Sequence, residues 1–335
     1  MTSPFIEACR GRQTSFTPIW LMRQAGRYMK EYREVRDKVS FLELCRAPEL
    51  AAKVTVDAAD KLKVDAAIIF ADILLILEPL GFHLTFEKGD GPRIHNPVRG
   101  AEDLARLRAY EPGALAYVSD AIRLARRALK VPLIGFAGAP FTLASYAIEG
   151  GSSKDHALTK AFLHRDPGAF KALLDIFARA VNVYLRAQVD AGADAVQLFD
   201  SWAGVLPPED YREHVLPHSK AALAGFSVPT IHFGTGTATF LEDFAQAGDV
   251  VGVDFHVPLD VAWKRVGEKR AVMGNLDPAV LLAGRPAVER EARKILRKAS
   301  KRPGHIFNLG HGITPTTPVD DVIRLVELVH EESRR

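Results

Sequence analysis

The chain has 335 residues, of which 47% are hydrophobic and 25% are charged, a composition typical of a globular protein. Its 44 basic and 41 acidic side chains leave a formal net charge of only +3, so overall charge gives no reason to expect a nucleic-acid partner. Any binding of anions must therefore depend on a local group of residues.

The N-terminal segment MTSPFIEACRGRQ has no apolar core of signal-peptide length, so we expect the mature protein to begin here and to act in the cytoplasm. The most apolar stretch, residues 64–77, is too short for a membrane span and contains Asp65 and Asp72. We therefore expect no membrane association. This stretch predicts a buried strand followed by a helix.

The two cysteines, Cys9 and Cys45, lie far apart in the sequence and lack CxxC spacing. This spacing argues against a disulfide framework and against a thiolate metal site, and it fits a reducing cytoplasm. Free cysteine commonly behaves as a small hydrophobic residue, so we expect packing or surface thiols rather than nucleophiles.

Short apolar, β-prone runs alternate with longer segments of helical periodicity, which is the pattern of βα units around a parallel sheet. Eight runs occur in chain order, at residues 18–22, 65–70, 131–136, 194–199, 229–233, 250–255, 270–274 and 305–309. They predict an α/β protein built as a single (βα)₈ TIM barrel over residues 1–335. Because such a barrel typically needs about 250 residues, there is room for insertions and for an N-terminal extension over about residues 1–16.

The longest gap follows the second run and contains residues 83–100. Alternating apolar and polar residues flank a Gly-Asp-Gly turn signal at residues 89–91, which predicts a hairpin-like loop insertion. No Pro-rich, Ser-rich or like-charged run marks a flexible linker, and the amphipathic residues 167–192 predict a barrel helix.

Polar residues and glycines follow most of the predicted strands. They occupy residues 23–27, 71–72, 137–140, 200–201, 234–236, 275–277 and 310–312. The C-terminal strand ends of a parallel barrel meet on one face, where the catalytic residues of barrel enzymes lie. Any one of these segments could be an ordinary turn. Arginines, a carboxylate and a histidine that converge on this face instead favour a single site.

Arg23 and Arg27 are four residues apart, which would place them on one side of a helical turn, and Gly26 permits a backbone conformation that other residues resist. A guanidinium is always charged and binds carboxylate or phosphate through paired hydrogen bonds, so the pair suits a substrate with several anionic groups. The alternative is a solvated helix face on which Arg27 pairs with Glu31. Arg36 is a further candidate of the same kind.

Asp72 lies within the otherwise apolar residues 68–75, where an isolated carboxylate is costly to bury without a partner. The partner could be structural, because aspartate is a good cap for a helix that begins at Ile73. It could equally be an N–H group of a ligand. The sequence leaves both alternatives open.

The run GFAGAPFTLASYAIEGG, residues 135–151, places Tyr146 on a predicted helix after glycines at a strand end. Tyr146 could orient a substrate carboxylate, or it could be a core tyrosine with a satisfied hydroxyl. The run contains neither GxGxxG nor GxxxxGK[ST], which argues against a nucleotide site. His311 lies between two glycines at the last strand end, and this exposed backbone setting favours a role in the site.

Two segments, PIWLMRQAGRYMKEYREVR and GFAGAPFTLASYAIEGG, closely resemble the signature segments of the uroporphyrinogen decarboxylase family. The segments IIFADIL, QLFDSWAG, GNLDP and NLGHGI also resemble that family, in the same order, so the resemblance covers essentially the whole chain. It implies a (βα)₈ barrel, usually a homodimer with two facing clefts, that uses no cofactor and no metal. The implied reaction removes carbon dioxide from the four acetate side chains of uroporphyrinogen III and gives coproporphyrinogen III.

Position by position, the resemblance implies that Arg23 and Arg27 bind substrate carboxylates and that Asp72 contacts the pyrrole N–H groups. Asp72 would also stabilise the cationic pyrrole that forms when the ring is protonated before carbon dioxide leaves. Further binding or catalytic contacts are implied at Arg36, Tyr146, Ser201 and His311. The proton donor stays open among an arginine, a water held by one, Tyr146 and His311.

The same residues leave two alternative functions. A related cobalamin-linked methyltransferase would carry a zinc-bound thiolate in a His-x-Cys pattern near the fifth strand, but glycine stands at that position here, in Ile231-His232-Phe233-Gly234. A non-catalytic tetrapyrrole-binding protein would keep the cleft without turnover. The presence of all the expected positions favours the enzyme.

Overall fold

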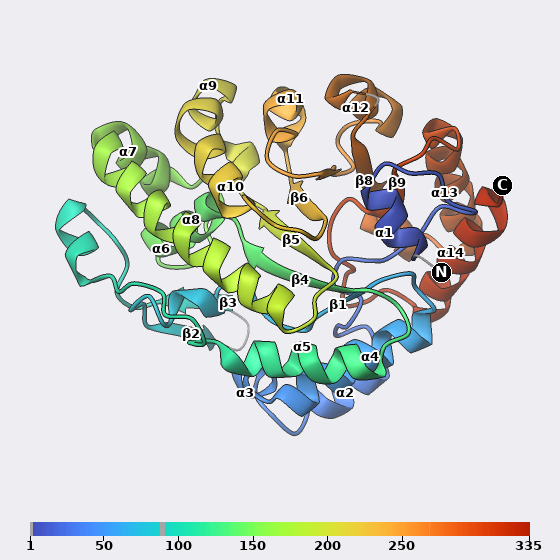
Figure 1. Cartoon of the computed structure of the whole chain (residues 1–335), viewed down its shortest axis with the longest axis horizontal. Helices are drawn as coiled ribbons and strands as arrows, with labels where there is room; N and C mark the ends of the chain where they lie inside the picture. The colour runs from blue at the N-terminus through green and yellow to red at the C-terminus, as the bar shows by residue number, and fades with distance from the viewer. Residues whose placement is uncertain (1–2, 88–90, 268) are drawn as a thin grey trace.

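The computed structural model describes residues 3–87, 91–267 and 269–335. A curled sheet of seven parallel strands lies inside a layer of helices (Figure 1). In spatial order its strands are β1 (Ala67–Ile68), β4 (Leu133–Gly138), β5 (Ala195–Asp200), β6 (Thr230–Gly234), β7 (Val250–Gly252), β8 (Ala271–Leu276) and β9 (His305–Leu309). Each strand pairs with the next strand of this sheet along the chain, as in a TIM-like barrel. All residues of β4, β8 and β9 are buried, as in parallel sheets that are covered on both faces, which explains the continuous apolar runs.

The first expected strand, residues 18–22, is not a strand of this sheet, whereas each of the other seven expected runs overlaps one strand. Ile19 instead forms a single parallel bridge with Phe307 of β9. On its other side, the Asp65 backbone N–H donates to the Ile19 carbonyl (2.8 Å), and the Ile19 N–H donates to the Asp65 carboxylate (2.8 Å). Residues 18–22 therefore lie between the two edge strands. They do not form a regular strand, because Pro18 has no N–H and Ile19 donates its N–H to the Asp65 side chain instead of to a neighbouring strand.

Helices surround the sheet. In chain order the α-helices of the described residues are α1 (Pro4–Cys9), α2 (Lys30–Arg36), α3 (Phe41–Arg46), α4 (Pro48–Leu62), α5 (Ala116–Ala128), α6 (Pro140–Glu149), α7 (Ala157–Arg165), α8 (Pro167–Asp190), α9 (Pro208–Asp210), α10 (Leu216–Ala222), α11 (Leu241–Phe244), α12 (Leu259–Val266), α13 (Arg285–Ala299) and α14 (Val319–Ser333). The expected helix over residues 167–192 is α8. It begins at Pro167 because the Asp166 side chain accepts the Ala169 N–H (2.9 Å) and caps the first turn. None of these helices is long and apolar enough to cross a membrane.

The helix expected directly after the second run is wrong. Residues 71–74 form no helix, and the short 3₁₀ turn η1 (Leu75–Leu77) follows. The reason is local, because the Asp72 side chain accepts the Leu74 N–H (2.8 Å) and so offers the backbone an alternative to helical bonding.

Within residues 83–100, β2 (Leu84–Glu87) and β3 (Gly91–Ile94) form an antiparallel pair in which Leu84 faces Ile94. The turn expected at residues 89–91 lies largely outside the described residues. The Ile94 N–H donates to the carbonyl of Gly150 (2.9 Å), which attaches this pair to the end of α6.

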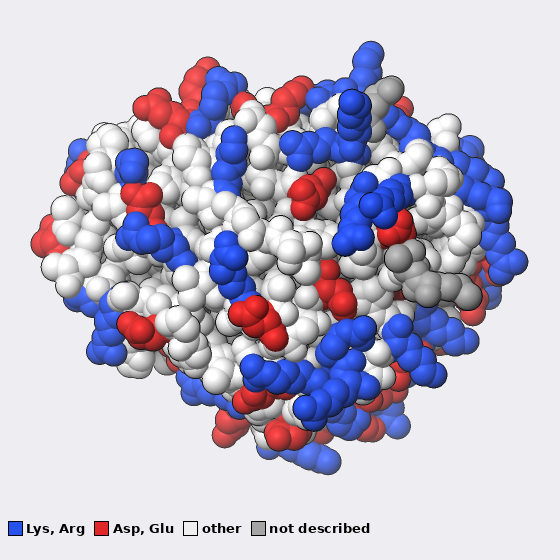
Figure 2. Space-filling model, viewed as in Figure 1, with Lys and Arg blue, Asp and Glu red and all other residues white. Residues whose placement is uncertain are grey.

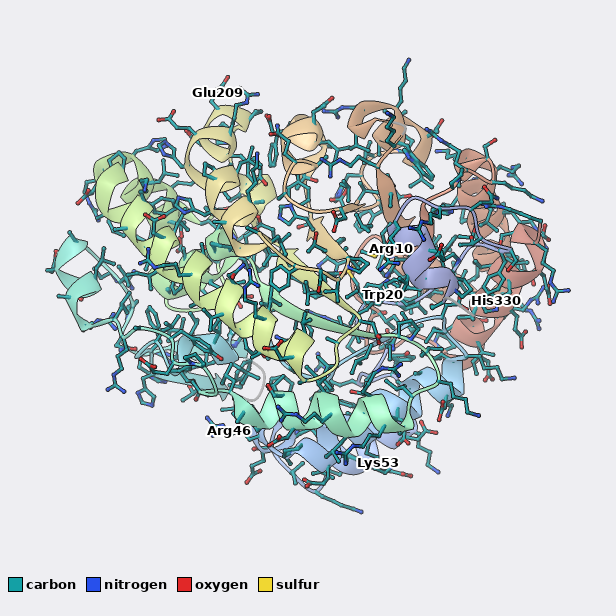
Figure 3. The ribbon with its side chains drawn as sticks, viewed as in Figure 1. Arg10, Trp20, Arg46, Lys53, Glu209 and His330 are labelled. Atoms are coloured by element: carbon teal, nitrogen blue, oxygen red, sulfur yellow. The ribbon has the colours of Figure 1, made fainter. Side chains whose placement is uncertain are left out.

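Trp20 of the segment between β9 and β1 is fully buried and lies inside the molecule in Figure 3, whereas Arg46 and Lys53 point outward from α3 and α4. Basic and acidic side chains are interspersed over the face shown in Figure 2, in agreement with the small net charge. The segment that carries Trp20 is therefore part of the hydrophobic core. The surface shown carries both positive and negative charges.

Candidate active site

Four of the expected site residues come together from four separate segments. Arg23 interacts electrostatically with Asp72, Tyr146 and His311, and the Asp72 carboxylate also interacts with Tyr146. Asp72 follows β1, Tyr146 lies on α6 after β4, and His311 follows β9. All three residues follow the C-terminal ends of parallel strands, so their convergence follows from the parallel sheet.

Asp72 is partly buried, and its Oδ1 accepts the Leu74 N–H. Burial raises the pKa of the Asp72 carboxyl to about 6, and the hydrogen bond from Leu74 and the charge of Arg23 oppose that rise. The carboxylate has a structural partner as well as a position in the site. At pH 7 it is mainly ionised.

The expected helical turn over residues 23–27 is wrong. Arg23 itself adopts a left-handed backbone conformation (φ 62°), while Gly26 does not. This conformation costs a residue with a side chain on the order of 1–3 kcal/mol, so surrounding contacts must impose it. The Met22 N–H donates to the Asn308 side chain (3.2 Å), and the Ile313 N–H donates to the Met22 carbonyl (3.0 Å). The loop that carries Arg23 is therefore attached to β9 and its following loop.

Arg27 and Arg36 form a second group. Both interact electrostatically with Tyr32, whose ring lies 5.5 Å from that of Phe70, two residues before Asp72. Arg27 is exposed, whereas Arg36 is partly buried and donates to the carbonyl of Val39. The alternative in which Arg27 pairs with Glu31 is wrong: Glu31 accepts from Lys61 (2.6 Å). The Arg27 guanidinium thus stays at the surface beside the first group.

Tyr146 is partly buried, and its ring lies 6.0 Å from the ring of Trp202. Burial raises the pKa of its phenol, and the Asp72 charge raises it further. Ser201 precedes Trp202, and its carbonyl accepts from the Thr235 hydroxyl (2.6 Å). The contact described for Ser201 is made by its backbone, so Ser201 is linked to Tyr146 through its neighbour Trp202.

His311 is partly exposed, and its Nδ1 accepts the Gly312 N–H (2.8 Å). Partial burial and the charge of Arg23 lower the pKa of the imidazole, while Asp254 opposes that shift. The ring is therefore neutral at pH 7. With Nδ1 acting as an acceptor, its proton lies on Nε2.

Sequence reasoning did not identify the buried polar side chains that anchor these loops. Asp200 is fully buried and accepts from the Thr142 hydroxyl (2.9 Å), which in turn accepts the Trp202 N–H (3.3 Å). Asp254 is buried after β7 and accepts the Gly236 N–H (2.6 Å). Their position at strand ends was a signal, but only the packing distinguishes a loop anchor from a turn residue.

The position at which the zinc alternative needs a thiolate is closely packed. His232 is fully buried, and its Nδ1 lies 3.2 Å from the carbonyl oxygen of Phe244. A Cβ placed at Gly234 would lie 2.6 Å from Cζ of Phe244, so the site has no room for a cysteine there. In residues 3–87, 91–267 and 269–335, no three His, Cys, Asp or Glu side chains are grouped to hold a metal ion.

Comparisons with known proteins agree with the sequence resemblance. The family model described as "Uroporphyrinogen decarboxylase (URO-D)" matches residues 1–332. The uroporphyrinogen decarboxylase of Sorangium cellulosum is 55% identical over 100% of this chain and 97% of its own length, and that of Roseiflexus sp. is 53% identical over 99% of each. A methyltransferase structure from Methanosarcina mazei has a TM-score of 0.80 over 98% of each chain but only 20% identity, so it supports the fold alone.

Proposed function

Since this chain belongs to the uroporphyrinogen decarboxylase family, we propose that it removes carbon dioxide from all four acetate side chains of uroporphyrinogen III without a cofactor and gives coproporphyrinogen III. The chain is a carboxy-lyase of haem biosynthesis. The observation that carries the site assignment is the convergence of Arg23, Asp72, Tyr146 and His311.

Asp72 has the central role in this proposal. Loss of carbon dioxide from a pyrrole acetate leaves an electron pair, and protonation of the ring's α-carbon beforehand creates a cationic pyrrole that can accept it. The exocyclic methylene then takes up a proton to become the methyl group, and the α-carbon releases its proton to restore the pyrrole. Asp72 is ionised at pH 7 and held by Leu74, so it would accept pyrrole N–H groups and stabilise the cation. A preorganised carboxylate aimed at charge that develops in the transition state contributes several kcal/mol.

The arginines would hold the substrate carboxylates. Arg23 and Arg27 are exposed, and Arg36 lies beside Arg27 across Tyr32. Paired hydrogen bonds from guanidinium groups would orient the acetate that reacts. Ser201 would add a polar contact from the loop after β5.

The α-carbon must receive a proton before carbon dioxide leaves. Tyr146 keeps its phenolic proton because its pKa is raised, and His311 carries its proton on Nε2. Arg23, or a water that it holds, is a third donor on the same face. Geometry in the bound complex selects among them.

The same proposal includes the finer architecture. Residues 18–22 between β9 and β1 would complete a single closed (βα)₈ barrel over residues 1–335, with residues 1–16 as an extension and 83–100 as an insertion. A homodimer in the cytoplasm is proposed from the family resemblance, and the two free, buried cysteines fit a reducing compartment. Size-exclusion chromatography with light scattering tests the dimer.

The decisive experiment is an anaerobic product assay with uroporphyrinogen III and no added cofactor. We expect coproporphyrinogen III and four equivalents of carbon dioxide. Tight binding of the substrate without turnover would instead identify a tetrapyrrole-binding protein and would overturn the proposal. Stoichiometric zinc in the purified protein would reopen the methyltransferase alternative.

A further inference from the structure

A buried carboxylate orients an exposed imidazole directly after β7. Asp254 is 1% exposed, whereas the His256 side chain is 59% exposed. His256 Nδ1 lies 2.8 Å from Asp254 Oδ2, and the His256 backbone N–H donates to Asp254 Oδ1 (3.1 Å). The carboxylate fixes the imidazole through Nδ1, which leaves Nε2 directed away from it.

The turn around this pair is held on both sides. The Asn275 side chain donates to the carbonyls of Asp254 (2.8 Å) and Val257 (2.6 Å). The His256 ring stacks on the ring of Phe255 with centroids 4.4 Å apart and planes inclined by 30°. Binding a ligand through His256 would therefore require little further ordering of the side chain.

The turn lies among the loops of the candidate site. A Cβ at Gly310 would lie 2.4 Å from the backbone nitrogen of Phe255, so the loop that carries His311 packs directly on this turn. Asp254 interacts electrostatically with His311 and also accepts the Gly236 N–H from the loop after β6. His256 thus belongs to the same C-terminal face as Arg23 and Asp72.

We propose that His256 is a further substrate-binding residue, whose Nε2 donates to a substrate carboxylate when the imidazole is protonated, and that Asp254 is its positioning residue. The inference rests on the proposed function, because that function supplies a substrate with several carboxylates. The arginines lie on the loop after residues 18–22 and on α2, whereas His256 approaches from the loop after β7. A bulky polycarboxylate would then be held from two directions.

The test compares steady-state kinetics with uroporphyrinogen for wild type, His256→Gln and His256→Lys. Loss of one hydrogen bond to a substrate carboxylate should raise KM about tenfold in His256→Gln with kcat within about twofold, and the positive charge of the lysine in His256→Lys should restore much of the affinity. His164→Gln, on the outer helix α7, is the matched control and should leave both constants unchanged.

Asp254→Asn tests the positioning role. It should raise KM as His256→Gln does. Added to His256→Gln, it should raise KM no further, because both changes disrupt the same Asp254–His256 pair. An unchanged KM in His256→Gln, or a fall in kcat alone, would overturn the inference while leaving the proposed function intact. Absence of turnover by the wild type would overturn both.

Discussion

The Arg23 side chain crosses directly over Gly312. A Cβ at position 312 would lie 2.5 Å from Cδ of Arg23 and 2.8 Å from its Cγ, which is closer than real side-chain contacts allow. A side chain at position 312 would therefore displace the side chain of Arg23, which lies nearly 290 residues earlier in the chain. Together with the bond from Ile313 to Met22, this contact couples the two loops of the site.

Gly312→Ala should displace Arg23 and raise KM by about tenfold, since the arginine would lose its position over the site. The melting temperature should change little, because the exposed Arg23 side chain can move into solvent. Gly168→Ala is the matched control: its nearest contact would be an ordinary 3.6 Å. Equal KM values in the two variants would contradict the proposed role of Arg23.

Asp72→Asn should lower kcat by about a hundredfold or more, because the amide cannot neutralise the cationic pyrrole. The same change should raise the free energy of unfolding at pH 7 by about 1–2 kcal/mol, since it removes a charge that the fold desolvates. Activity and thermal unfolding of one purified variant measure both effects. A loss of activity together with a loss of stability would indicate a structural role instead.

Asp65→Asn is the control for the Asp72 variant. Asp65 accepts from the Ile19 N–H and from His330, both at 2.8 Å, and so attaches the segment between β9 and β1 to α14. We expect a lower melting temperature and an unchanged kcat. Opposite stability changes in the two aspartate variants would separate the site carboxylate from the structural one.

The activity should depend on pH through Asp72. Because the pKa of Asp72 in the fold is about 6, kcat/KM should fall as pH falls below 6 and approach a tenfold loss per pH unit. Stability has the opposite sign: the native state binds the proton more tightly than the unfolded chain, so this group's contribution to the free energy of unfolding falls as pH rises from about 4 to 6. Asp72→Asn should lack that stability term, which pH-dependent unfolding curves would show.

Arg27→Ala should raise KM by about tenfold and leave kcat within a few fold, because one charge-assisted bond to a substrate carboxylate is lost. The effect should shrink at high salt, since the guanidinium is exposed. Arg10→Ala, beside the N-terminal ends of β6, β7 and β8, should leave KM unchanged. An unaltered KM for Arg27→Ala at low salt would remove this residue from the binding set.

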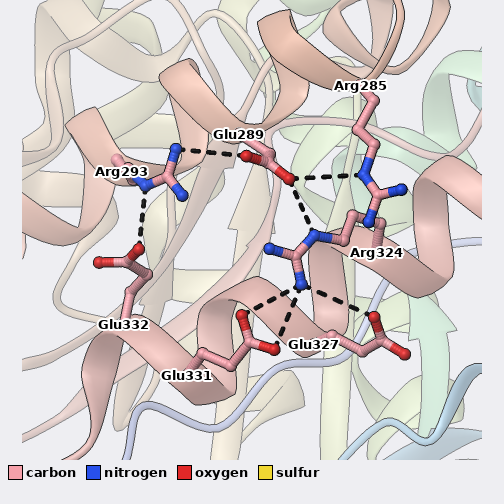
Figure 4. Close-up of polar contacts among 7 residues, drawn as sticks. All are labelled: Arg285, Glu289, Arg293, Arg324, Glu327, Glu331 and Glu332. Carbon is pink, nitrogen blue, oxygen red and sulfur yellow. Dashed lines mark hydrogen bonds and ion pairs between the residues drawn. The ribbon is translucent and has the colours of Figure 1, made fainter.

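Arg324 joins α13 and α14 at the centre of an ion-pair network (Figure 4). Its guanidinium lies 2.9 Å from Glu289, 3.1 Å from Glu331 and 3.7 Å from Glu327. Arg324→Met should lower the melting temperature by about 1–3 °C, an effect that salt weakens. Arg12→Met breaks one exposed pair with Glu7 and should have almost no effect, so calorimetry of both variants tests whether the network matters.

Local chemistry explains which elements could be predicted. The apolar runs at β4, β5 and β9 are long enough to be recognised, and Pro167 after Asp166 marks the start of α8. Residues 18–22 have the same apolar character, yet their pairing depends on the Asp65 carboxylate, which lies more than 40 residues away. The turn at Asp72 failed as a helix prediction because a side chain competed for a backbone N–H.

The sequence by itself determined the alternation of strands and helices, the positions of Asp72 and His311 after strands and of Arg23 after an apolar run, and, through its signature segments, the family. These properties depend on residue type and spacing along the chain. Only the tertiary structure decided the left-handed conformation of Arg23, the shifted pKa of Asp72 and the pairing of His256 with Asp254. The conformation of Arg23 depends on contacts with a distant segment, the pKa of Asp72 depends on desolvation, and the pairing of His256 with Asp254 depends on how the backbone after β7 folds. A local sequence pattern therefore encodes none of them.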